Sequence, residues 1–231
     1  MGCEVVPMGE NTWRIENEGV RFFLLAGREK ALLVDTGMTA PDARQIAGSL
    51  TALPLSLLNT HSDRDHISGN GAFPSVYMHP AEEEHYRAVG GTGTVIPVRD
   101  GDELDLGDRP LRIIHLPGHT PGSVAVLDVD RRALISGDPI QENGRIFMFG
   151  PHRDLRDYVD SLVRLDRRRD EFDEIWPSHA AIPVSPGRIA DLAEGAQRIL
   201  AGQLRPRSAR VFDQDILVYD LGFTRMLCGK E

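Results

Sequence analysis

Cysteine is scarce in this chain, and its scarcity excludes two kinds of site. Only Cys3 and Cys228 occur among the 231 residues, so neither a disulfide framework nor a zinc site built from several cysteines can form. Long apolar runs are missing as well. The longest one covers residues 22–26, far below the roughly 18 apolar residues that a membrane span needs. We therefore expect no membrane partner.

Positive charge is in deficit. The chain carries 26 basic and 35 acidic residues, a formal net charge of −9, and a surface of this sign repels a phosphate backbone. We therefore expect no nucleic-acid partner. The N-terminal segment has no basic start followed by an apolar stretch, because Glu4, Pro7 and Glu10 interrupt it. A cytoplasmic location is the default expectation.

Several catalytic motifs are also absent from the sequence. It contains no Gly-x-Ser-x-Gly elbow for a serine nucleophile and no Gly-x-x-x-x-Gly-Lys-Ser/Thr loop for nucleotide phosphates. The glycine-rich stretch 90–93 precedes a predicted strand rather than a helix, which argues against a dinucleotide site. What remains is an ordinary globular composition with 41% hydrophobic and 26% charged residues, together with eight histidines.

Hydrophobic periodicity predicts strands and helices in two successive sheet-then-helix blocks. The predicted strands cover residues 20–26, 31–34, 55–58, 76–78, 95–98, 103–106, 111–116, 123–129, 133–136 and 175–176, with returning strands across 209–227. The predicted helices cover residues 41–53, 80–88, 154–167 and 186–200. This order predicts one domain over residues 1–231, in which helices cover two packed sheets and polar residues from many strand ends meet at one edge.

The densest chemical signal follows the predicted strand 55–58. The pattern His61-x-Asp63-x-Asp65-His66 places four side chains able to bind a metal within six residues. If strand geometry continued, alternation would aim residues 61, 63 and 65 the same way and His66 elsewhere. Such divergence suits two metal ions better than one.

Three further candidates follow later predicted strands. They are His119, Asp138 and His179. Small or rigid neighbours, such as Pro117 and Gly118 before His119, let the backbone turn sharply and bring a side chain to a sheet edge.

With these residues the chain resembles the metallo-β-lactamase superfamily, whose hallmark is a His-x-His-x-Asp-His loop followed by lone His, Asp and His ligands in that order. The resemblance runs from about Thr12 to Leu227 and includes Asp35-Thr36-Gly37 and the Pro-Gly-His-Thr-Pro-Gly-Ser run at 117–123. Five separate motifs agree in order, which is a strong signal. The resemblance implies an α/β fold, a four-layer αβ/βα sandwich with a dinuclear metal site at the sheet edges.

The resemblance also implies a ligand set, position by position. The first metal would be held by His61, Asp63 and His119, and the second by Asp65, His66 and His179, with Asp138 bridging the two.

Asp63 departs from the family pattern, which usually has histidine at this position. A carboxylate here resembles the flavodiiron branch of the superfamily, which uses iron for redox chemistry. The harder oxygen donor shifts preference from zinc toward iron or manganese without excluding zinc. The alternative is that Asp63 is too short to reach the metal, so that the enzyme runs on one ion.

Five residues are weaker candidates for supporting the ligands or touching the substrate: Asp35, His115, Phe147, Phe149 and His152. Asp35 either bonds a ligand histidine or only forms a turn. His115 shares a strand face with His119 if the strand continues, or else is simply packed. The two phenylalanines form either an apolar wall for substrate or a buried strand. His79 and His85 are expected to be ordinary surface histidines.

These observations predict a metal-dependent hydrolase acting on a small-molecule substrate. Two divalent ions, zinc first and iron or manganese as alternatives, would activate a water molecule, and Asp65 would orient this nucleophile and pass a proton to the leaving group. Esters, lactones, thioesters, amides and phosphodiesters all fit this chemistry. One rival is a non-haem di-iron oxidoreductase related to the flavodiiron branch, which Asp63 favours. Another is a non-catalytic binding protein stabilised by metal.

Overall fold

The computed structural model describes residues 2–230, in which the chain forms three β-sheets and four α-helices. The first sheet has seven strands in chain order: β1 (Glu4–Pro7), β2 (Thr12–Asn17), β3 (Val20–Ala26), β4 (Ala31–Val34), β5 (Leu55–Leu58), β6 (Ser75–Met78) and β7 (Thr94–Pro97). The second sheet has the order β13-β11-β10-β9-β8 and contains β8 (Glu103–Asp105), β9 (Pro110–His115), β10 (Val124–Asp128), β11 (Ala133–Gly137) and β13 (Glu174–Pro177).

The first two sheets pack face to face, and β3 shows why. All seven of its residues are buried, so it reads as a continuous apolar run with two covered faces. Phe23 and Leu25 belong to the core between the sheets, whereas Phe22 and Leu24 belong to the core under the helices. The two-residue period of a strand thus supplies both apolar layers from one segment.

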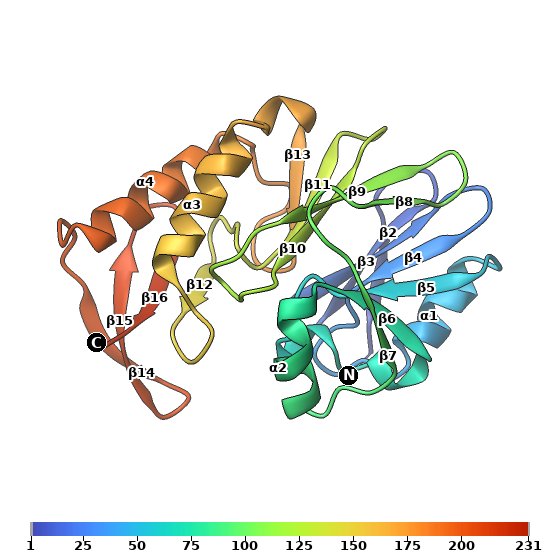
Figure 1. Ribbon diagram of the computed structural model, residues 1–231, viewed down its shortest axis with the longest axis horizontal. Helices are drawn as coiled ribbons and strands as arrows, with labels where there is room; N and C mark the ends of the chain where they lie inside the picture. Colours follow the sequence, from blue (N-terminus) through green and yellow to red (C-terminus); the bar gives the residue numbers. More distant parts are fainter. Residues whose placement is uncertain (1, 231) are drawn as a thin grey trace.

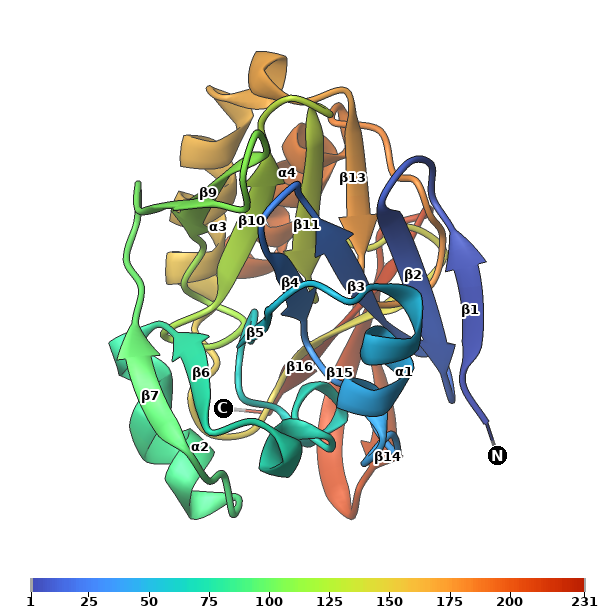
Figure 2. The same ribbon diagram turned by 90° about the vertical axis from the view of Figure 1, so that its right-hand side faces the viewer.

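The helices form the outer layers. They are α1 (Ala43–Leu50), α2 (Glu83–Ala88), α3 (Leu155–Asp166) and α4 (Arg188–Leu200). Ala47 of α1 and Tyr86 of α2 are buried against the first sheet, and Leu162 of α3 and Ile189 of α4 are buried against the second. Figure 2 shows α1 in front of the first sheet and α3 and α4 behind the second. The arrangement is the four-layer αβ/βα sandwich that the sequence predicts.

A third sheet lies beside α3 and α4, on the left of Figure 1. Its order is β12-β16-β15-β14, with β12 (Arg145–Met148), β14 (Arg207–Val211), β15 (Gln214–Asp220) and β16 (Arg225–Gly229). Ile146 and Met226 anchor it in the core under α3 and α4. The prediction of returning strands was right, but they do not extend a main sheet, since β16 pairs in parallel with β12.

A buried ion pair ties the first two sheets together. The Arg109 guanidinium donates to Asp128 Oδ2 at 2.6 and 3.0 Å within the second sheet. It also donates to the Ala26 carbonyl at 2.9 Å and to Thr12 Oγ1 at 2.7 Å in the first. These bonds fix the relative position of the sheets.

None of the helices formed by residues 2–230 is both long enough and apolar enough to cross a bilayer. The cellular compartment stays a prediction.

Candidate metal centre

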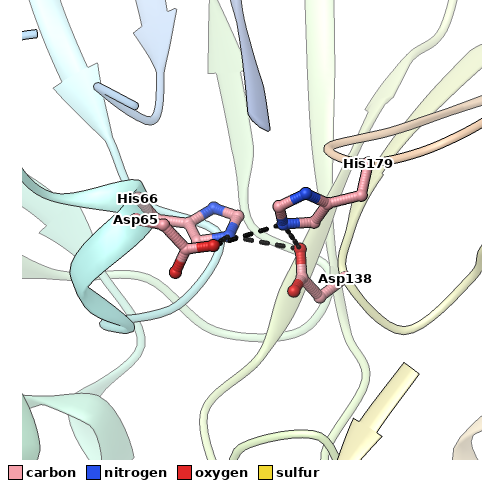
Figure 3. A group of neighbouring side chains, drawn as sticks. All are labelled: Asp65, His66, Asp138 and His179. Carbon is pink, nitrogen blue, oxygen red and sulfur yellow. Dashed lines mark ion pairs between the residues drawn. The ribbon is translucent and has the colours of Figure 1, made fainter. Parts of the chain in front are cut away.

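Seven side chains that can bind metals meet where strands of both main sheets end. His61, Asp63, Asp65 and His66 follow β5, His119 lies between β9 and β10, Asp138 follows β11, and His179 follows β13. Figure 3 shows Asp65, His66, Asp138 and His179 pointing toward one another. The segment after β5 does not continue as a strand, because Arg64–His66 forms a short 3₁₀ turn, η1. The condition under which residues 61, 63 and 65 would share a strand face is therefore not met.

The side chains form two groups whose potential ligand atoms lie within 4.8 Å of one another: His61, Asp63 and His119, and Asp65, His66, Asp138 and His179. In the first group, Asp63 Oδ2 lies 3.5 Å from His61 Nε2 and 3.4 Å from His119 Nε2.

Asp138 lies between the two groups. Its Oδ1 is 3.2 Å from His66 Nε2 and 3.3 Å from His179 Nε2, and its Oδ2 is 3.7 Å from His119 Nε2. This is the arrangement expected of a carboxylate that bridges two metal ions.

The four histidines turn their Nε2 atoms toward the carboxylates of the cluster. Their Nδ1 atoms contact Thr60 Oγ1 (His61, 3.0 Å), Asp35 Oδ2 (His66, 2.9 Å), the Phe147 carbonyl (His119, 3.0 Å) and the Gly19 carbonyl (His179, 2.8 Å). The Asp35 and carbonyl oxygens can only accept, and the Thr60 hydroxyl already donates to Asp35. Each Nδ1 therefore carries the proton, which leaves an Nε2 lone pair on each ring for a metal.

Four of the inward-facing atoms are buried without a hydrogen-bond partner: His61 Nε2, His66 Nε2, His119 Nε2 and Asp138 Oδ1. Unpaired buried polar atoms are costly and uncommon in folded proteins. Their convergence with two carboxylates, one in each group, fits divalent cations as the missing partners.

The charges of the second group reinforce this fit. Burial raises the pKa of Asp138, but the adjacent His179 and His66 outweigh it and hold that pKa well below its usual range. Burial likewise lowers the pKa of His179, and the contact with Asp138 more than compensates and raises it to about 10. The carboxylates thus favour positive charge at this position, which a divalent cation bound to the Nε2 atoms would supply.

Asp35 contacts the cluster directly. Its Oδ2 accepts from His66 Nδ1 at 2.9 Å and from Thr60 Oγ1 at 2.8 Å, and its Oδ1 accepts from the Thr60 amide at 2.8 Å. The backbone of Asp35 is left-handed, with φ of 67°, a conformation that Asp and Asn tolerate better than other non-glycine residues. Asp35 therefore does both things that the sequence suggests as alternatives: it forms a turn and it accepts a hydrogen bond from a candidate ligand histidine.

Asp63 also contacts two side chains outside the first group, Arg153 and His85. Arg153 Nη2 donates to its Oδ2 at 2.5 Å, and His85 Nε2 lies 3.8 Å from its Oδ1. Burial raises the pKa of Asp63, but the contacts with His119 and His61 outweigh it and hold the pKa well below its usual range. With Oδ2 at 3.5 and 3.4 Å from the Nε2 atoms of His61 and His119, the carboxylate is long enough to reach the first group. Whether it binds the metal stays a prediction.

Two functional neighbours were missed in the sequence. Arg153 carries no local pattern that links it to residue 63, 90 positions away. Buried Glu82 accepts from the amide and hydroxyl of Ser62 at 2.9 and 2.6 Å and from the Gly122 amide at 2.8 Å. It thereby joins the loop after β5 to the loop that carries His119. In the sequence, Glu82 is followed by Glu83 and Glu84 at the start of the predicted helix 80–88. Acidic residues at that end interact favourably with the helix dipole, so the pattern does not point to a link between loops.

The weaker candidates separate. His115 does not contact the His119 ring: it stacks on His79 at 4.0 Å between ring centroids and bonds to the Pro121 carbonyl at 2.9 Å. Of the two alternatives for His115, these contacts fit the packed histidine, because the turn at 117–118 redirects the chain. His152 packs against His85, with 5.3 Å between ring centroids, and so reaches Asp63 only through that ring. His85 is not the isolated surface histidine that we expected.

A cavity of about 1060 Å³ opens beside the cluster. Phe147 and Phe149 line it, whereas Met148 between them is buried in the core. Side chains alternate between the two faces of this strand. The stretch is therefore both an apolar cavity wall, through the two phenylalanines, and a partly buried strand, through Met148. Met38, Phe212 and Phe223 extend the apolar lining, and Phe212 at the tip between β14 and β15 is 79% exposed.

Comparison with known proteins identifies the family. Residues 17–179, which include all seven candidate ligands, match the family model described as the metallo-beta-lactamase superfamily. The chain belongs to the metallo-beta-lactamase superfamily. A solved metallo-beta-lactamase from Pontibacter korlensis has the same fold, with a TM-score of 0.73 and 17% identity over 85% of this chain and 99% of that chain.

Three relatives within the superfamily carry enzyme names. The acyl-coenzyme A thioesterase MBLAC2 of Gallus gallus is 29% identical over 68% of this chain and 71% of its own length. A hydroxyacylglutathione hydrolase of Gloeobacter violaceus is 31% identical over 60% of this chain and 55% of its own length. The human mitochondrial persulfide dioxygenase ETHE1 is 32% identical over 53% of this chain and 48% of its own length. The expectation of a metallo-hydrolase of this superfamily is confirmed at this level, and the substrate and metal stay open.

Proposed function

We propose that this member of the superfamily is a dinuclear metal hydrolase that cleaves acyl thioesters. The observation that carries the proposal is the convergence of unpaired imidazole nitrogens and carboxylates beside a large, partly apolar cavity. His61, Asp63 and His119 would hold one divalent ion, and Asp65, His66 and His179 the other, with Asp138 between them. Zinc is the first candidate, with iron or manganese favoured by the oxygen donor of Asp63.

The residues around the cluster divide the work of hydrolysis. Divalent ions bound there would lower the pKa of the attacking water and stabilise the negative charge of the oxyanion. Asp65 lines the cavity and would accept the proton of the attacking water and return it to the leaving thiol. Asp35 and the Gly19 carbonyl hold the His66 and His179 rings so that their Nε2 atoms face the cluster.

The choice of a thioester rests on the cavity and on the relatives. Phe147, Phe149 and Phe212 offer an acyl group an apolar wall next to the ligands, and a cavity of about 1060 Å³ is large for a simple lactone or ester. The names of the thioesterase and of the glutathione hydrolase describe removal of an acyl group from a thiol-containing carrier.

The proposal is tested with purified protein and a substrate panel in which one acyl group is presented as thioester, oxygen ester, lactone and amide. We expect the highest kcat/KM for the thioester, loss of activity after treatment with a chelator, and recovery when a divalent metal is returned. His66→Ala should behave like the chelated protein. Equal rates with and without metal, or no thioester hydrolysis by fully metallated protein, would contradict the proposal.

A di-iron oxidoreductase is the second candidate. Asp63 in the first group favours it, and the similarity to a protein named persulfide dioxygenase supports it. Iron bound tightly after purification, together with dioxygen consumption and no hydrolysis across the panel, would favour this function over the thioesterase.

A further inference from the structure

Two arginines stand side by side on the third sheet without an acidic partner. Arg145 of β12 and Arg225 of β16 are register partners in the parallel pair. Both are exposed and both line the cavity that contains the ligand cluster. Across residues 2–230 neither guanidinium has a hydrogen bond or an ion pair with another side chain.

This placement is unfavourable for folding alone. Like charges on directly paired strand positions repel each other, and the chain has 35 acidic residues with which to neutralise them. The nearby carboxylates are engaged elsewhere. Glu142 pairs with Arg188 at 2.7 Å. Asp220 is the register neighbour of Arg225 on β15, but it accepts from the Gly222 amide at 2.9 Å and lies 4.0 Å from the Arg207 guanidinium. The two cations are thus left free at the cavity wall.

β12 connects these cations to the ligand cluster. Arg145 and Phe147 are two residues apart, and both side chains line the cavity, while Ile146 and Met148 are buried in the core. The Phe147 carbonyl accepts from His119 Nδ1 at 3.0 Å. On β12, the Phe147 carbonyl thus supports a candidate metal ligand, the Phe147 ring lines the cavity, and Arg145 places a cation two residues away. Two residues advance roughly 7 Å along a strand, so the cation lies about that far from the Phe147 position.

We propose that Arg145 and Arg225 form a binding site for the anionic end of the thiol carrier in the substrate. This inference rests on the proposed thioester hydrolysis and assigns the recognition of its leaving group. Two neighbouring guanidinium groups bind phosphate or carboxylate oxygens through paired charge-assisted hydrogen bonds. The phosphates of a coenzyme A carrier and the carboxylates of a glutathione carrier both provide this chemistry. A neutral carrier does not.

The kinetic test compares one acyl group on three carriers: coenzyme A, glutathione and uncharged N-acetylcysteamine. The double variant Arg145→Gln/Arg225→Gln should lower kcat/KM for the carrier that the site recognises by about tenfold or more, chiefly through KM. The rate with N-acetylcysteamine should stay unchanged. Arg198→Gln removes an exposed charge from α4, outside the cavity, and should change neither rate.

A binding test separates failure of this site from failure of the proposed thioester hydrolysis. The S-methyl thioethers of coenzyme A and glutathione cannot be hydrolysed, and calorimetry measures their affinity for the metallated protein. We expect at least one to bind about tenfold more weakly to the double variant, and the one affected identifies phosphate or carboxylate as the recognised group. This loss supports the site even if no thioester is hydrolysed. Unchanged affinity for both thioethers, or an equal loss of kcat/KM with the neutral carrier, overturns it.

Discussion

Asp63 belongs both to the first group of candidate ligands and to an ion pair. Its Oδ2 faces both ring nitrogens of the first group at 3.5 and 3.4 Å, and the same oxygen accepts from Arg153 at 2.5 Å. A fixed cation so close opposes the binding of a second cation. The first group should therefore bind its ion more weakly than the second group does.

Replacement of Arg153 tests this competition. Arg153→Gln removes the positive charge beside Asp63 and should tighten metal binding at the first group by several-fold or more. Titration against a competing chromophoric chelator measures the affinity. Arg156→Gln, an exposed change on α3, serves as the matched control. An affinity at the first group that is unchanged or lower in Arg153→Gln would show that Arg153 instead orders Asp63 for binding.

Asp35 supplies a second test at this scale. Asp35→Asn keeps a side chain that tolerates the left-handed backbone but places an NH₂ group against donors from Thr60 or His66. We expect metal affinity at the second group to fall by about 10- to 100-fold, as is typical when the partner of a ligand histidine is lost. The same chelator titration gives the value. If the metal affinity of the second group changes by less than about threefold, Asp35 serves the turn alone and does not support His66 as a ligand.

At the scale of elements, the site depends on loops that follow strands. Short apolar runs ending in polar residues were enough to predict β3, β4, β5 and the meeting of polar side chains at one edge, because strand ends of packed sheets share an edge. β1 and β2 escaped prediction. In β2 only Trp13 and Ile15 are apolar, so it has no apolar run, although three of its six residues are buried. The β12–β16 pair escaped as well. It joins segments about 80 residues apart in sequence, and local patterns do not encode such pairings.

Glu82 links the loop after β5 to the loop that carries His119, a contact that sequence patterns did not reveal. Burial raises the pKa of Glu82, but the contacts with Ser62 and Thr120 outweigh it and lower the pKa. A group with a lowered folded pKa stabilises the protein above its unfolded pKa, and this contribution is lost as the pH falls through the folded pKa.

Glu82→Gln should therefore destabilise the protein most at neutral pH. An amide nitrogen would face donors from Ser62 or Gly122, so we expect the free energy of unfolding at pH 7 to fall by about 1–3 kcal/mol. The difference from wild type should shrink in acid. Urea unfolding at the two pH values measures both effects. Glu83→Gln, at the exposed first residue of α2, is the control. Equal losses in the two variants would rule out a specific link between the loops.

At the scale of the whole molecule, the layers follow from composition while their alignment follows from a few buried polar contacts. The apolar runs require two sheets with helices outside, and the structure has this arrangement. The bonds of Arg109 to Asp128, Ala26 and Thr12 then fix one sheet against the other. Nothing in the local sequence pairs residue 109 with residue 26. This part of the fold could not be predicted.

Asp128→Ala should destabilise the whole fold. It leaves the Arg109 guanidinium buried without a counter-ion, and breaking a buried ion pair in this way costs about 3–5 kcal/mol. Chemical denaturation monitored by circular dichroism gives the free energy of unfolding. Asp173→Ala breaks the exposed pair with Arg132 and should have a far smaller effect. If both variants lose similar stability, the buried pair is not what holds the sheets together.

The central claim is that this chain holds two divalent ions in a cluster that includes Asp63. Metal analysis by mass spectrometry of the purified protein, alongside Asp63→His and Asp63→Ala, tests it most directly. We expect about two ions per chain in the wild type and in Asp63→His, with a larger share of zinc in the latter, and about one ion in Asp63→Ala. Near-zero metal in the wild type that neither substitution changes would contradict it.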